Sequence, residues 1–110
     1  MAARASAAIA SGERLLLCDL VLAECVYVLE SFYEVPRERI AVLMRAAIAL
    51  PNMETIDAPT LLRALEVYER QRLDFAEGYL AAQAEVTGVG EVLSFDRSID
   101  RLGTVTRREP

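Results

Sequence analysis

Long segments with helical spacing of their hydrophobic residues alternate with short apolar runs along the chain. We expect helices over Ala2–Ala10, Leu20–Tyr33, Pro36–Leu50, Pro59–Arg70 and Asp74–Thr87, with a short helical turn at Arg97–Leu102. We expect strands at Leu15–Cys18, Glu54–Ile56, Glu91–Phe95 and Thr104–Arg107. This order predicts an α/β fold, in which a short parallel sheet is flanked by helices on both faces and ligands bind at the carboxyl ends of the strands.

Polar residues beside these segments predict where the helices begin and end. Asp19 and Asp57 each precede a helical segment and are expected to cap it. Asp74 and Glu77 have the spacing of a capping box, and Gly88 follows the last helical position of its segment. In the fourth expected helix, four residues should face inward: Leu61, Leu62, Leu65 and Tyr68.

The length of 110 residues fits one domain, spanning residues 1–110. No uninterrupted apolar run approaches the roughly 20 residues that cross a bilayer, and the N-terminus lacks the apolar part of a signal peptide. We therefore expect a cytoplasmic protein with no membrane contact. Cys18 and Cys25 match neither a disulfide framework nor a zinc spacing, so both are expected to be reduced packing residues.

Histidine is absent from the chain, and every basic residue is Arg. These facts exclude Ser-His-Asp and Cys-His catalysis, so any chemistry must use carboxylates. The formal charge of −5 argues against broad capture of nucleic acid, although it leaves room for a local basic rim. Four arginines near the C-terminus could contact an RNA backbone, or could be solvated or ion-paired: Arg97, Arg101, Arg107 and Arg108.

Glu24 is the only charged residue in the segment Leu20–Leu29. Burying an unpaired carboxylate costs several kcal/mol or forces its protonation. Glu24 is therefore expected to face a pocket, a cation or a partner, unless it lies at the helix edge and reaches water or an arginine.

Acidic residues stand where a parallel sheet would gather them: Asp19, Glu24, Asp74, Glu77 and Asp96. Mg²⁺ and Mn²⁺ take oxygen ligands from a few carboxylates of different elements. Without a cation, converging carboxylates would repel one another and raise their own pKa values. The set predicts a divalent ion whose bound water hydrolyses a phosphodiester. Helix capping explains Asp74, Glu77 and Asp96 equally well when each is taken singly.

The order and spacing of three motifs resemble the PIN domain, in particular the ribonuclease toxins of VapBC-type toxin–antitoxin pairs. These motifs are Asp19–Glu24, Leu73–Ala82 and Leu93–Asp96. The resemblance implies that Glu24, Glu77 and Asp96 are catalytic and hold Mg²⁺ or Mn²⁺ for RNA cleavage, with Asp74 as a helix cap and supporting ligand. It further implies a PIN-like three-layer domain, an RNA substrate, a cognate antitoxin and a homodimer.

The chain departs from the family pattern in two places. The third motif usually has Asp where this chain has Glu77, and Ala where it has Gly78; Glu still binds metal, but with a longer reach. PIN domains also open with a central strand that ends in an Asp-Thr-Asn-like motif, and nothing before Leu15 matches it. We therefore expect an N-terminally truncated domain with unpaired strand edges and an uncovered apolar slot.

Two other functions stay open. The first is a non-catalytic PIN remnant that dimerises or binds an antitoxin through the apolar segments Leu20–Tyr33 and Pro36–Leu50. The second is a phospho-acceptor receiver domain, which also gathers carboxylates at strand ends. Receiver domains have a Lys near the site, and this chain has none, so the receiver hypothesis ranks last.

Overall fold

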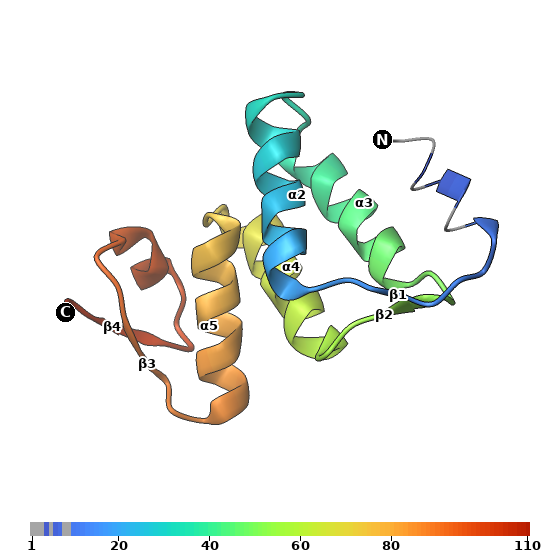
Figure 1. The fold of residues 1–110 in the computed structure, drawn as a ribbon. Coiled ribbons are helices and arrows are strands. Elements are labelled where there is room, and N and C mark those ends of the chain that lie inside the picture. Colours follow the sequence, from blue (N-terminus) through green and yellow to red (C-terminus); the bar gives the residue numbers. More distant parts are fainter. Residues whose placement is uncertain (1–3, 5, 8–9) are drawn as a thin grey trace.

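The computed structural model describes residues 4, 6–7 and 10–110 (Figure 1). The helix expected over Ala2–Ala10 depends on residues 2–3, 5 and 8–9, which lie outside the described residues. The chain forms β1 (Leu15–Leu16), α2 (Asp19–Ser31), α3 (Arg37–Ile48), β2 (Met53–Glu54), α4 (Ala58–Gln71), α5 (Phe75–Thr87), β3 (Glu91–Leu93), the 3₁₀ helix η1 (Arg97–Arg101) and β4 (Thr106–Arg108). The expected α/β fold with parallel strands and flanking helices is confirmed.

The strands form two separate parallel pairs, which corrects the expectation of a single sheet. β1 pairs with β2, and β3 pairs with β4. Within the described residues no strand joins β1 to β3, so each of these strands has one edge without a partner strand. Ile56 and Phe95 were expected inside strands, but they lie beyond the paired stretches and are exposed.

Two of the expected capping residues cap their helices as predicted. The Asp57 side chain caps α4 by accepting the N–H of Thr60, and Gly88 ends α5 with a φ of 73°. The capping roles expected for Asp19 and the Asp74–Glu77 pair are wrong, because neither helix start has a side-chain cap hydrogen bond. The Asp19 and Glu77 carboxylates accept hydrogen bonds from distant elements instead.

Two hydrophobic clusters form the core, and α4 and α5 contribute to both. The first cluster contains Leu22, Val26, Ile40, Leu61, Ala64, Leu65, Tyr68, Phe75 and Ala82. The second contains Val67, Leu73, Ala81, Ala84, Val92, Ile99, Leu102 and Val105. The helix pair α4–α5 therefore joins the side of the molecule that holds β1 and β2 to the side that holds β3 and β4 (Figure 1).

The inward face of α4 differs from the expectation at one residue. Leu61, Leu65 and Tyr68 are fully buried, but Leu62 is 40% exposed. Leu62 lies about 100° around the helix from Leu61, outside the buried stripe.

Arg37 of α3 holds the connection between α4 and α5. Its Nη1 atom donates hydrogen bonds to the carbonyl oxygens of Tyr68, at 2.8 Å, and Leu73, at 2.6 Å. Its guanidinium also lies 4.2 Å from the centroid of the Tyr68 ring, a cation–π contact. Arg72, in this connection, has a left-handed backbone with a φ of 58°.

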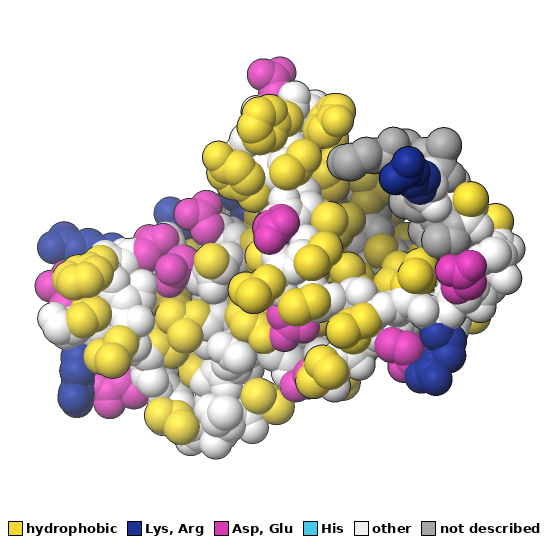
Figure 2. Space-filling view, viewed as in Figure 1, with side chains coloured by type: hydrophobic (Ala, Val, Ile, Leu, Met, Phe, Trp, Pro, Cys, Tyr) yellow, Lys and Arg dark blue, Asp and Glu magenta, His cyan; other side chains and the backbone are white. Residues whose placement is uncertain are grey.

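Figure 2 shows hydrophobic side chains gathered on the outer side of α2. We call this surface the α2 apolar face; it consists of Leu20, Val21, Tyr27, Phe32 and Tyr33, all of which are exposed. Contiguous apolar patches on soluble monomers often mark binding surfaces. None of the described helices combines the length and the hydrophobicity needed to cross a membrane.

Candidate functional site

Ser94 links Glu77 and Asp96, two of the four residues expected to bind metal. Its Oγ atom donates to Glu77 Oε2 at 3.0 Å and accepts the backbone N–H of Asp96 at 3.0 Å. Ser94 is 9% exposed, and its own N–H donates to the carbonyl oxygen of Arg108 in β4. The network therefore brings the start of α5 and the end of β3 together at one place, as the expectation of a carboxylate site required for these two residues.

Asp96 also caps η1, which confirms the structural role considered for it. Its Oδ1 atom accepts the backbone N–H of Ser98 at 2.9 Å. The Ser98 side chain, the Ser98 N–H and the nearby charges of Arg101 and Arg107 hold the pKa of Asp96 below its ordinary value. Asp96 is therefore a carboxylate at neutral pH, the form that binds a cation.

Glu24 has different surroundings from Glu77 and Asp96. Its side chain is exposed and borders a hollow whose other walls include Val21, Cys25, Val28 and Met44. Burial, and secondarily the charge of Glu24, raise the pKa of the Cys25 thiol. Glu24 thus reaches water while it borders this open hollow, which agrees with the solvent-exposed alternative considered for it. No contact in the described residues joins it to Ser94.

Asp74 lies exposed at the N-cap of α5. It borders a hollow together with Glu30 and Ala23 of α2. Within the described residues, no group of three or more His, Cys, Asp or Glu side chains lies close enough to hold a metal ion. The assignment of Glu24, Glu77, Asp96 and Asp74 to one metal site thus stays a prediction.

Asp19 and Tyr79 form a contact that sequence reasoning missed. The Tyr79 hydroxyl donates to Asp19 Oδ2, which joins the residue that begins α2 to α5. This bond, together with burial and the charges of Asp19 and Asp57, raises the pKa of Tyr79 to about 12. Asp19 Oδ1 is buried and has no hydrogen-bond partner within the described part of the chain. No local signal could reveal this pair, because 60 positions separate its members.

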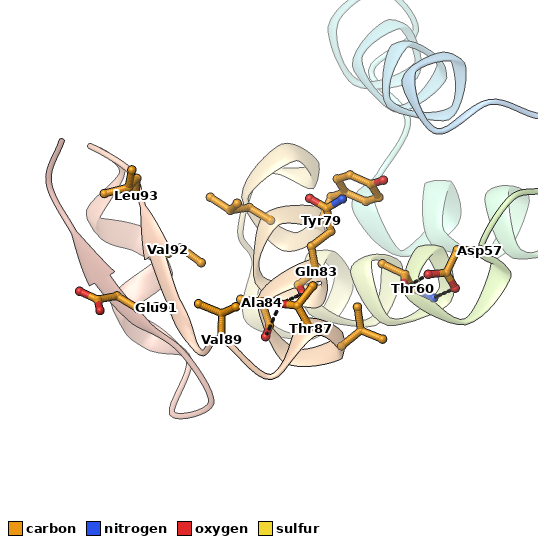
Figure 3. Close-up of a pocket in the computed structure, with 12 residues that line it drawn as sticks. Asp57, Thr60, Tyr79, Gln83, Ala84, Thr87, Val89, Glu91, Val92 and Leu93 are labelled. Atoms are coloured by element: carbon orange, nitrogen blue, oxygen red, sulfur yellow. Dashed lines mark hydrogen bonds between the residues drawn. The ribbon is translucent and has the colours of Figure 1, made fainter.

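A hollow of about 610 Å³ lies along α5, between β3 and the start of α4 (Figure 3). We call it the α5 hollow. Its floor includes Tyr79, Leu80, Gln83, Ala84 and Thr87, which follow one another along a single side of α5. Its walls are β3 on one side and the beginning of α4 on the other.

Three of the four C-terminal arginines contact acidic side chains or carbonyl groups, namely Arg101, Arg107 and Arg108. Arg107 pairs with Asp100 at 3.1 Å, and Arg108 pairs with Glu91 at 2.7 Å. Arg101 donates to two carbonyl oxygens at the end of α4. Ion pairing therefore accounts for Arg107 and Arg108, although Arg101 and Arg107 still place positive charge near the Asp96 carboxylate.

Comparison with known proteins gives a family match over nearly the whole chain. The PIN domain family matches residues 1–105. The VapC ribonuclease of Aquifex aeolicus (strain VF5) is 31% identical over 97 residues, which cover 86% of this chain and 70% of that protein. No solved structure matches the chain significantly. The motif order, the α/β fold and these matches agree: the chain belongs to the PIN domain family and is similar to VapC nuclease toxins.

Proposed function

We propose that this chain acts as a metal-dependent endoribonuclease toxin of a VapBC-type toxin–antitoxin system. The observation that carries the proposal is the Glu77–Ser94–Asp96 network, in which a buried hydroxyl holds two carboxylate residues from different elements together. The family match and the relative described as a VapC ribonuclease support RNA as the substrate and an antitoxin as the partner.

The donor set on α5 and β3 fits Mg²⁺ or Mn²⁺. Mg²⁺ is usually held by one or two carboxylates, with water and substrate phosphate oxygens as its other ligands. Glu77 and Asp96 supply two carboxylates at one place, and neither is consumed by an ion pair in the described residues. We assign the ion to these two residues. The family resemblance adds Asp74, at the N-cap of α5, and Glu24 of α2 as further ligands.

The ion would supply a water of lowered pKa and would stabilise negative charge on the phosphate. The chain's own residues prepare this site. Ser94 fixes Glu77 Oε2, and Ser98 fixes Asp96 Oδ1, so the remaining carboxylate oxygens are oriented before any ligand arrives. Arg101 and Arg107 lower the local negative potential beside Asp96, where a phosphate backbone would approach.

RNA cleavage by the purified chain tests this proposal. Cleavage should require Mg²⁺ or Mn²⁺ and should stop in EDTA. Glu77→Gln and Asp96→Asn should each reduce cleavage to the level of the EDTA control, and Glu24→Gln, at a further assigned ligand, should reduce cleavage as well. Glu66→Gln is the matched control, since Glu66 lies on α4 and pairs with Arg63, away from the proposed site.

Two results would contradict the metal mechanism. One is undiminished cleavage in EDTA, and the other is full activity of both Glu77→Gln and Asp96→Asn in folded protein. Circular dichroism spectra of all variants should be recorded, because they separate loss of the site from loss of the fold.

A non-catalytic binding module is the second candidate function. The α2 apolar face favours it, because Leu20, Phe32 and Tyr33 are each at least 70% exposed and offer a docking surface. This candidate predicts that the chain binds an antitoxin or a second copy while no metal restores RNA cleavage. Phe32→Ser should then abolish binding, and Glu77→Gln should leave it unchanged.

A further inference from the structure

Arg37 contacts the backbone that leads into α5. Its Nη1 atom donates to the carbonyl oxygens of Tyr68, at 2.8 Å, and Leu73, at 2.6 Å. The Tyr68 carbonyl belongs to the last turn of α4, where carbonyl groups lack partners within their own helix. The Leu73 carbonyl stands one residue before Asp74, the N-cap of α5. Arg37 therefore binds both the end of α4 and the residue before the start of α5.

The ring contacts of Tyr68 continue from Arg37 into α5. The Arg37 guanidinium lies 4.2 Å from the centroid of the Tyr68 ring. The Tyr68 ring meets the ring of Phe75, the first residue of α5, edge to face, and the two centroids are 6.3 Å apart. The Phe75 ring stacks in turn on Tyr79, one turn further along the helix. Because Tyr68 and Phe75 are buried and closely packed, a displacement of the guanidinium reaches the first turn of α5.

The first turn of α5 also packs closely on α4. A Cβ atom built at Gly78 would lie 3.0 Å from a backbone carbonyl oxygen of α4, which is tighter than ordinary van der Waals contact. The N–H of Gly78 donates to the Asp74 carbonyl at 2.9 Å and closes this turn. Glu77 belongs to the same turn, and its carboxylate accepts the hydrogen bond from Ser94. The backbone of Glu77 is thus placed by α4 and Arg37, and its side chain is placed by Ser94.

A second arginine of α3 provides a matched comparison. Arg45 Nη2 pairs with Glu69 Oε1 of α4 at 2.8 Å, so this arginine also joins α3 to α4. Within the described part of the chain, neither Arg45 nor Glu69 forms a hydrogen bond or ion pair with α5. Loss of Arg45 therefore loosens α3 on α4, whereas loss of Arg37 also frees the start of α5.

We propose that Arg37 is a positioning residue of the carboxylate site. By holding the Leu73 carbonyl and the Tyr68 ring, it sets the position of the first turn of α5 and, with it, the place of the Glu77 carboxylate. The inference rests on the proposed function, in which Glu77 binds Mg²⁺ or Mn²⁺. Arg37 acts through the backbone and not on the ion, so its loss should weaken metal binding by disturbing a ligand that is otherwise held in place.

Amide exchange in metal-free protein tests the positioning itself. The Gly78 N–H reports on the first turn of α5, because it donates to the Asp74 carbonyl. Its exchange should be at least about fivefold faster in Arg37→Gln, the effect of losing about one net hydrogen bond. Arg45→Gln should stay within about twofold of the parent. Parental exchange at Gly78 in Arg37→Gln would overturn the proposal, and so would equal acceleration in both variants.

Calorimetric titration with Mn²⁺ tests the consequence for the site. Arg37→Gln should bind Mn²⁺ at least about tenfold more weakly than the parent, the usual effect of disturbing the support of a metal ligand. Arg45→Gln should match the parent. Arg37→Lys keeps a cation with N–H donors but loses the planar fork, so its affinity should lie between those of Arg37→Gln and the parent. Parental affinity in folded Arg37→Gln, or equal affinities for Arg37→Lys and Arg37→Gln, would overturn the proposal.

The two measurements separate this inference from the proposed function. If the parent binds no Mn²⁺, the proposed metal site fails, while exchange at Gly78 still decides whether Arg37 places the start of α5. If the parent and folded Arg37→Gln bind Mn²⁺ equally well, the metal site stands and the positioning role falls. If Arg37→Gln does not fold, Arg37→Lys takes its place in both comparisons with the parent, and parental exchange together with parental affinity in Arg37→Lys would overturn the proposal.

Discussion

On the β3 side of α5, a buried serine holds Glu77 by a hydrogen bond of 3.0 Å, whereas on the α2 side Glu24 lies exposed among hydrophobic neighbours. Both carboxylates belong to motifs of the same family pattern. The two parts of the candidate site therefore differ in support: hydrogen bonds from Ser94 and Ser98 hold the Glu77–Asp96 part, and the position of Glu24 depends on one helix.

The two core clusters also lie on different sides of the molecule. The first lies under α2, α3 and α4, and the second lies between α5 and the segment that contains β3, η1 and β4. Since α4 and α5 contribute to both clusters, the two sides should unfold together.

The largest expected effect comes from truncating one buried residue in each cluster. Leu65→Ala and Ile99→Ala each remove a fully buried side chain, and each should lower the free energy of unfolding by about 2–5 kcal/mol. Urea denaturation followed by circular dichroism should show one transition for each variant. Leu62→Ala, at a position 40% exposed, should have a much smaller effect. Two separate transitions would show that the α4–α5 pair does not couple the clusters.

The Ser94→Ala substitution tests whether the Ser94 hydroxyl orients Glu77 for metal binding. Loss of the hydroxyl frees Glu77 and should weaken Mn²⁺ binding by about 10–100-fold, the usual effect of removing a group that orients a metal ligand. Calorimetric titration with Mn²⁺ measures the change. Ser94→Thr keeps the hydroxyl and should restore binding, and Ser31→Ala on the exposed end of α2 should have no effect. Equal affinities for Ser94→Ala and the parent would remove Ser94 from the site.

The smallest effect concerns the titration of Tyr79. Its pKa is raised to about 12 chiefly by the hydrogen bond to Asp19, so Asp19→Asn should lower this pKa toward 10. The parent keeps this contribution to stability below about pH 10 and loses it as the pH rises toward 12, because the unfolded state releases the proton first. Absorbance at the phenolate band during alkaline titration checks the shift, with Tyr79→Phe identifying the signal. An unchanged titration in Asp19→Asn would contradict the contact.

Periodicity and turn chemistry predicted most of the fold. The helical segments appear near their expected positions, and Asp57 and Gly88 end their helices as expected because their local geometry needs no distant partner. Asp19 and Glu77 were mistaken for caps, since each carboxylate has a stronger partner elsewhere, in Tyr79 and Ser94. The strands form two separate pairs, and no local sequence pattern indicates which strands pair with each other.

The candidate site was predicted only in part. Glu77 and Asp96 come together because they stand at the start of a helix and after a strand that packs on it. The sequence did indicate that Ser94 faces inward. Ser94 lies two positions after the buried Val92, and residues two apart in an extended segment face the same side. The direction of the Glu24 side chain could not be predicted, because it depends on the rotation of α2 about its own axis.

The Arg37 contacts have a consequence for the order of folding. The turn between two successive helices is ordinarily a local structure, yet this one is completed by a side chain that precedes its bonded carbonyls by 31 and 36 positions. Closing so long a loop must come before the turn acquires its final geometry, and distant contacts of this kind slow folding. A Lys at this position would carry a single ammonium in place of the planar fork, so the turn should form later and less completely.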